Sequence, residues 1–204
     1  MTVIADVYFI NVTFKEFHSE ESKVPTISNS FDLNSVEWRR ITDPDSTAFL
    51  VDFEYSLLGY DIASGRLDML LRYGKGGHCR RHRHVASTVT LVLEGEQILQ
   101  QTAPDGSTEL IHRKKGDYAL AAADAHPHLE HGGDHGGTVL LSMTAQNGIL
   151  FEYFDESMNS TGTVSIDQYV QSWVEGTAYG KVSVDSQLVQ AKSSISGCPL
   201  AHMK

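Results

Sequence analysis

The central part of the chain alternates hydrophobic and polar positions in short runs that turn residues separate. Residues 66–73 illustrate the pattern, because every second side chain is apolar and would share one face of a strand: Leu67, Met69, Leu71 and Tyr73. Further short apolar runs follow at intervals of roughly 8–12 residues, with Gly, Pro, Asn or Asp between them. This spacing predicts an all-β sandwich or barrel.

Turn residues indicate where the strands should end. Glu94-Gly95 predicts a turn between two strands, and Asn147-Gly148 predicts a hairpin between the runs 138–145 and 149–154. The His- and Gly-rich stretch 126–137 is expected to form a loop.

The region near residue 170 has a different period. Apolar residues recur there at the spacing of one helix face: Ile166, Tyr169, Val170, Trp173 and Val174. Ser165 and Gln168 fit a capping box, and Gly176 fits a helix stop. The sequence therefore predicts one amphipathic helix that packs on the barrel or on a partner subunit.

These patterns divide the chain into four parts. Residues 1–45 are expected to form a leader with edge strands, and residues 46–155 the barrel. Residues 156–180 should contain the helix, and residues 181–204 should form a mobile tail.

Composition limits the partners and the compartment. The net charge of −10 argues against a nucleic-acid partner, because phosphates favour a basic surface. No apolar run approaches the ~20 residues of a membrane span, so we expect no membrane partner. The start of the chain lacks the pattern of a secretory signal, and Cys79 and Cys198 are interpreted as free thiols. Together these features predict a cytoplasmic protein.

Histidines are concentrated in the middle of the chain. Eight of the ten lie between His78 and His135. A buried histidine without a partner costs stability, so such a concentration indicates metal binding, proton handling or a polar pocket. The alternative is a set of solvated loop histidines.

Two of these histidines have the spacing of metal ligands. His82 and His84 would share one face of a strand and could each give one nitrogen to the same ion. A third ligand would have to come from another strand, and His126 follows the predicted strand 118–124 at its loop end. Two further residues are candidates for catalysis. Arg80 shares the face of His82 and could steer an anionic substrate, while Glu96 could accept a hydrogen bond from a metal-binding imidazole or be a surface carboxylate.

The stretch GGHCRRHRHVASTVTLVLEGE, residues 76–96, resembles the first cupin motif, in which a glycine precedes H-x-H. Gly116-Asp117 followed by HPH about ten residues later resembles the second cupin motif. The resemblance covers about residues 36–175. It implies a double-stranded β-helix, a jelly-roll barrel, with an appended C-terminal α-helix.

Thr88 occupies the position at which most cupins carry a metal-binding glutamate. The chain therefore resembles the three-histidine branch that contains acetylacetone dioxygenase and 2,4'-dihydroxyacetophenone dioxygenase. This resemblance implies an Fe(II) site formed by His82, His84 and His126, with His128 as the alternative third ligand. His126 is preferred because ADAH fits the Gly-x-x-His corner of the family.

The implied activity is the Fe(II)- and O2-dependent cleavage of a C–C bond in a small β-diketone or hydroxy-ketone. Three neutral imidazoles would leave the metal its full double charge and up to three open positions. Zn, Mn or Ni are alternative metals, because imidazole suits several ions. A non-catalytic metal-binding sensor and a Zn or Mn hydrolase or lyase remain alternative functions. Cupins commonly pair, so the resemblance also implies a homodimer.

Overall fold

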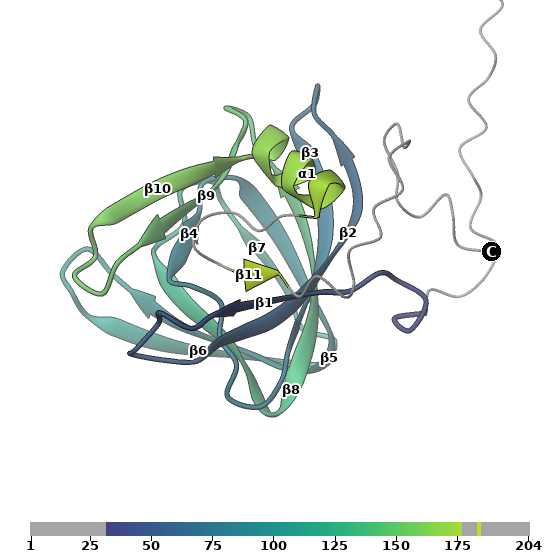
Figure 1. Ribbon diagram of the computed structural model, residues 1–204. Coiled ribbons are helices and arrows are strands. Elements are labelled where there is room, and N and C mark those ends of the chain that lie inside the picture. Colours follow the sequence, from purple (N-terminus) through teal and green to yellow (C-terminus); the bar gives the residue numbers. More distant parts are fainter. Residues whose placement is uncertain (1–31, 177–182, 185–204) are drawn as a thin grey trace, which may run out of the picture. The chain divides into compact units, whose positions relative to one another are not determined.

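The computed structural model describes residues 32–176 and 183–184 (Figure 1). Most of the predicted leader and nearly all of the predicted tail therefore lie outside the described residues. The elements in chain order are β1 (Arg39–Asp43), β2 (Val51–Asp61), β3 (Arg66–Tyr73), β4 (His82–His84), β5 (Ser87–Thr102), β6 (Thr108–Lys114), β7 (Tyr118–Ala121), β8 (His128–Thr144), β9 (Ile149–Phe154), β10 (Ser160–Ser165), α1 (Ile166–Glu175) and β11 (Ser183–Val184).

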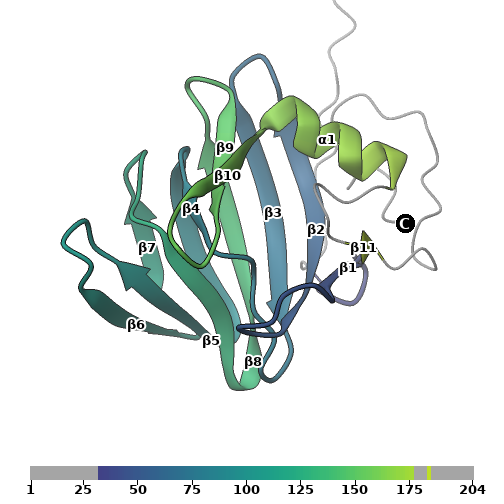
Figure 2. The same ribbon diagram turned by 60° about the vertical axis from the view of Figure 1, so that its left-hand side comes forward.

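The strands form one antiparallel sheet that curls into a half-barrel (Figure 2). Its main path runs in the order β10-β9-β4-β8-β3-β2-β1-β11, and β5 branches from β8 to carry β6 and β7. The long strands β5 and β8 pair along most of their length and so join the two parts of the sheet. The predicted all-β jelly-roll with a C-terminal helix is confirmed.

The turn predicted at Glu94-Gly95 is wrong, because β5 continues through both residues. Gly95 instead adopts a positive φ of 61°, and the register with β8 shifts on either side of it. Gly137 of β8 pairs with Gly95. The two strands lie so close there that a Cβ added to Gly137 would be 2.0 Å from the backbone oxygen of Glu96. A pair of glycines thus lets two long strands bend together without a break.

The loop predicted for residues 126–137 is also largely wrong. β8 begins at His128, and its pairing with β5 is interrupted only between Gly132 and Gly137. The glycines that suggested a loop allow the backbone to pack closely at this interruption. A Cβ added to Gly132 would lie only 2.8 Å from the backbone of Gly136.

The turn at Asn147-Gly148 forms, with Gly148 at a φ of 77°. However, β9 pairs with β4 and β10, and not with β8 as a hairpin would require. The turn therefore carries the chain away from β8 and towards β4, which places β9 beside the H-x-H segment.

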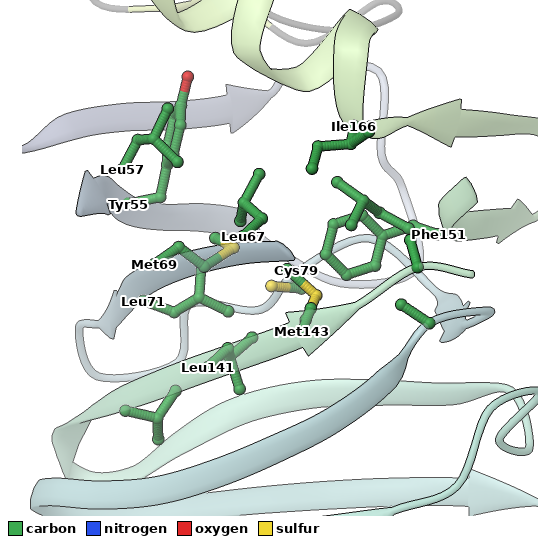
Figure 3. Close-up of a cluster of buried hydrophobic side chains, with 14 of the residues drawn as sticks. Tyr55, Leu57, Leu67, Met69, Leu71, Cys79, Leu141, Met143, Phe151 and Ile166 are labelled. Carbon is green, nitrogen blue, oxygen red and sulfur yellow. The ribbon is translucent and has the colours of Figure 1, made fainter. Parts of the chain in front are cut away.

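The predicted inner face of β3 is confirmed. Its four alternate side chains are at most 4% exposed and belong to the main hydrophobic core: Leu67, Met69, Leu71 and Tyr73. Figure 3 shows the first three of them within this core. A smaller apolar cluster covers the opposite face, where Leu70 packs with Trp38 and Leu58.

Helix α1 begins and ends as predicted. Ser165 and Gln168 form a reciprocal capping box, and Gly176 ends the helix in the left-handed conformation. Ile166, Val170 and Trp173 are buried in the core. The other side of the predicted apolar face differs, because Val174 is 43% exposed. No helix in the described part of the chain is long and apolar enough to cross a membrane.

Arg39 of β1 connects the end of the helix to the sheet. Its side chain is 1% exposed, and its guanidinium lies 3.8 Å from the ring centre of Trp173 and donates to the Trp173 carbonyl. Glu37 balances the charge at 2.8 Å. The helix has no basic residue in its last turn, so Arg39 supplies the positive charge that a helix C-terminus favours.

Replacing Trp173 by alanine should lower the free energy of unfolding by about 3–5 kcal/mol, because it empties a core position and removes the ring beneath Arg39. Val174→Ala is the matched control on the same helix and should cost less than about 1 kcal/mol, since its side chain is largely exposed. Urea unfolding of both variants measures the difference, and equal losses would contradict this description of the helix.

Candidate metal centre

Four buried side chains meet on the inner face of the sheet, where β4 lies against β8. His82 and His84 project from β4 to the same side, because they are two residues apart in a strand. His128, the first residue of β8, pairs directly with His82. Glu130 lies two residues further along β8 and therefore faces the same side.

The potential ligand atoms of these four residues all lie within 4.8 Å of one another. The Nε2 atoms of His82 and His84 are 3.2 Å apart. An oxygen of Glu130, Oε2, lies 4.0 Å from Nε2 of both His82 and His128. Ligand atoms bound to one ion at ~2.1 Å in a tetrahedron would be about 3.4 Å apart, so this spacing suits a single metal ion.

The hydrogen bonds of the three imidazoles determine which nitrogen faces the others. Nδ1 of His82 lies 2.7 Å from the carbonyl oxygen of Arg80, and Nδ1 of His128 lies 3.0 Å from that of His126. Because a carbonyl can only accept, both Nδ1 atoms carry the proton and donate it. The Nε2 atoms of the two neutral rings are therefore bare acceptors.

The same argument applies to His84 through a hydroxyl. Nδ1 of His84 lies 2.8 Å from Oγ1 of Thr88, and that hydroxyl donates to the carbonyl of Ala86 at 3.1 Å. The hydroxyl has only one proton, so it accepts from His84. Thr88 thus holds the ring of His84 so that its Nε2 faces the other residues of the cluster.

Burial keeps the three imidazoles neutral. The pKa of His82 is lowered to about 3, mainly by burial and in addition by the neighbouring His128. Burial also lowers the pKa of His84 well below its usual value and lowers that of His128. Neutral imidazole is the form that binds a metal.

This donor set fits a divalent cation. Three bare Nε2 atoms and a carboxylate oxygen point at one another in a buried site, and Nε2 of His128 has no hydrogen-bond partner among the described residues. Three bare imidazole nitrogens and a carboxylate oxygen that face one another are unfavourable unless a cation lies between them. Imidazole and carboxylate together suit Fe(II), Mn(II), Zn(II) or Ni(II).

The geometry places His128, and not the preferred His126, beside His82 and His84. The ring of His126 is exposed, and the residue contributes only its carbonyl, which accepts from His128. The reason is the early start of β8: once residue 128 is the first strand residue, residues 128 and 130 face inward. His128, the alternative named from the sequence, is therefore the histidine whose ring lies with those of His82 and His84.

Glu130 was missed in the sequence because a ligand carboxylate was expected only at the position of Thr88. A signal for it did exist, since His128 and Glu130 repeat the i, i+2 spacing of His82 and His84. The expectation of a site with three histidines and no carboxylate is thereby changed to a site of three histidines and one glutamate.

No imidazole of the cluster donates to Glu96, and the residue of this part of β5 that reaches the cluster is its neighbour Gln97. Gln97 is buried, and its Nε2 donates to Oε1 of Glu130 at 2.5 Å. Glu96 instead lies beside Gly133, outside the cluster of four. The bulge at Gly95 explains the difference, because it changes which side chains of β5 face inward.

Arg80 lies at a small pocket beside the metal centre. The pocket has a volume of about 50 Å³, and its lining is mainly apolar and aromatic, including His82, Phe151, Tyr153 and Tyr169. The guanidinium of Arg80 lies 5.3 Å from the ring centre of Tyr153 and 3.6 Å from a carboxylate oxygen of Asp43. Arg80 is thus near the site, but its charge is already balanced.

No protein-family model matches the sequence, and no curated protein matches it significantly. Solved structures do match the fold. An acetylacetone dioxygenase from Acinetobacter johnsonii superimposes with a TM-score of 0.52 at 10% identity, covering 86% of this chain and 99% of the other. An RmlC-like cupin protein from Ralstonia eutropha JMP134 also gives 0.52, at 14% identity over 72% of this chain and 85% of the other. The chain therefore has the fold of the cupin superfamily, and this fold resembles that of acetylacetone dioxygenase.

Proposed function

We propose that this chain is a metal-dependent cupin dioxygenase that uses Fe(II) and O2 to cleave a C–C bond in a small β-diketone or hydroxy-ketone. The observation that carries the proposal is the convergence of three bare imidazole nitrogens and a carboxylate beside a pocket. The fold it shares with acetylacetone dioxygenase supports the reaction class.

In this proposal His82, His84 and His128 bind the metal through Nε2, and Glu130 binds it through its carboxylate. A bound Fe(II) would polarise a chelating substrate and so activate it for reaction with O2. Glu130 cancels one of the two positive charges that three neutral imidazoles would leave. Four protein ligands leave two positions of an octahedron, which is enough for the two oxygens of a diketone or hydroxy-ketone.

The side chains that line the pocket would determine which substrate shape fits and would exclude water from the metal centre. The ring of Phe151 contacts both His82 and His84 edge-on, with ring centres 5.6 and 5.2 Å apart. Tyr153 and Tyr169 continue this aromatic wall. An apolar wall favours a compact organic substrate and strengthens the electrostatic effect of a bound cation on it.

Metal content tests the ligand set. His82→Ala, His84→Ala and His128→Ala should each lose most of the bound metal, because each removes one buried ligand. His126→Ala is the matched control, since it removes an exposed ring from the same segment and leaves the backbone carbonyl in place. Elemental analysis of the purified proteins, together with circular dichroism to confirm folding, measures the effect. Metal that survives the loss of His128 and vanishes with His126 would reverse the assignment.

Glu130→Gln tests the carboxylate separately. The amide keeps the size of the side chain but removes its charge, so the affinity for the metal should fall by at least about tenfold. Competition with a chromogenic chelator measures the affinity of the wild type and the variant. An unchanged affinity would leave a site with three histidine ligands only.

Oxygen consumption tests the reaction. The Fe(II)-loaded protein should consume O2 in proportion to added acetylacetone, used as a probe β-diketone, and the His84→Ala variant should not. An oxygen electrode and product analysis measure both. A protein that binds metal stoichiometrically but consumes no O2 with a panel of diketones and hydroxy-ketones would favour a sensor, or a Zn or Mn hydrolase or lyase.

A further inference from the structure

Helix α1 brings a hydroxyl group to the pocket beside the metal centre. Tyr169 lines this pocket together with His82 and Met69. Its hydroxyl donates to Sδ of Met69 at 3.5 Å, and because Met69 is itself a lining residue, the polar end of the tyrosine lies at the pocket wall. The side chains of the helix that are buried in the core are apolar, so Tyr169 differs from them in chemistry: Ile166, Val170 and Trp173.

The partner of this hydroxyl is a poor one. A thioether sulfur is a weak acceptor, so the hydrogen bond to Met69 stabilises the hydroxyl less than one to an oxygen would. Two other polar groups of the pocket wall have better partners. The guanidinium of Arg80 lies 3.6 Å from a carboxylate oxygen of Asp43, and the thiol of Cys79 lies 3.2 Å from the hydroxyl oxygen of Tyr73. The hydroxyl of Tyr169 would therefore gain more from a substrate oxygen than either of these groups.

The surroundings of Tyr169 fix it as a donor. Its ring packs against Phe151 at 6.1 Å between ring centres, and the buried Trp173 holds the next turn of the helix in the core. Burial is the main cause that raises the pKa of Tyr169 well above its usual value, so the hydroxyl keeps its proton. A donor whose position is set in advance loses little conformational freedom when a ligand binds.

The size of the pocket brings the metal centre and Tyr169 to the same ligand. Its volume of about 50 Å³ corresponds to about three to five water molecules. A small β-diketone would fill such a space. Because His82 lines the same pocket, a substrate that chelates a metal beside His82 would also contact the wall that Tyr169 forms.

We propose that the hydroxyl of Tyr169 donates a hydrogen bond to an oxygen of the chelating substrate and so favours its enolate form. This inference rests on the proposed function and deepens it by naming a substrate-binding residue. An enolate carries negative charge on its oxygens, and a hydrogen bond to a charged acceptor is stronger than one between neutral groups. On binding, the hydroxyl would exchange the sulfur of Met69 for this oxygen.

Tyr169→Phe tests the inference, because it removes the hydroxyl and keeps the ring. The Zn(II)-loaded protein is used with acetylacetone as the probe, so that binding is measured without oxidation. Calorimetric titration should show binding that is weaker by about 10–100-fold in the variant, the value of a hydrogen bond to a charged group. Ultraviolet absorption reports the enolate, and the pH at which half of the bound acetylacetone is enolate should be higher in the variant, since the enolate loses a donor.

Two further variants separate substrate binding from packing. Tyr55→Phe makes the same chemical change in a core ring that packs edge-on against Tyr169 but does not line the pocket. It should leave the affinity and the pH midpoint unchanged. In a Met69→Leu background, Tyr169→Phe should still weaken binding by a similar factor, because the substrate and not the sulfur is the acceptor that matters. Zinc content and circular dichroism are measured for every variant.

Equal affinity and an equal pH midpoint in the wild type and in Tyr169→Phe would overturn the inference and leave the proposed function in place. A loss that Tyr55→Phe reproduces, or that disappears in the Met69→Leu background, would also overturn it, because the hydroxyl would then act through packing alone. A wild type that binds zinc but neither acetylacetone nor acetoin, used as a probe hydroxy-ketone, would overturn the proposed function and the inference with it.

Discussion

The site depends on one cross-strand contact, the pairing of His82 on β4 with His128 on β8. β4 is only three residues long, and β9 holds it from its other side. This short strand gives the site its precision, because side chains at i and i+2 on two paired strands must share one face. Two such pairs, His82 with His84 and His128 with Glu130, are enough to gather four ligand atoms within 4.8 Å.

Burial determines which chemical form these four residues take. Each imidazole donates its Nδ1 proton to a carbonyl or a hydroxyl, so each Nε2 is left as an acceptor. Burial keeps the rings neutral and excludes the water that could otherwise satisfy them. The polar groups of the site are therefore complementary to a cation. The rigid β-sheet holds these acceptors close together although they repel one another.

The two sides of the metal centre differ in character. On one side, apolar and aromatic side chains around Phe151 join the main core, which helix α1 completes through Trp173. On the other side, β5 and β6 contribute a polar chain from Arg113 through Gln97 to Glu130.

The sequence by itself determined the local features of this protein. The period of two identified the inner face of β3, the helical period and the capping box identified α1, and H-x-H identified half of the site. Each of these depends on residues close together in the chain. The tertiary structure decided the rest: glycines at 95, 132 and 137 serve bulges in long strands instead of turns, and β8 therefore begins at His128. Strand pairing, register and bulges are set by distant partners, so only the folded sheet could place His128 instead of His126 beside His82 and His84 and bring Glu130 to them.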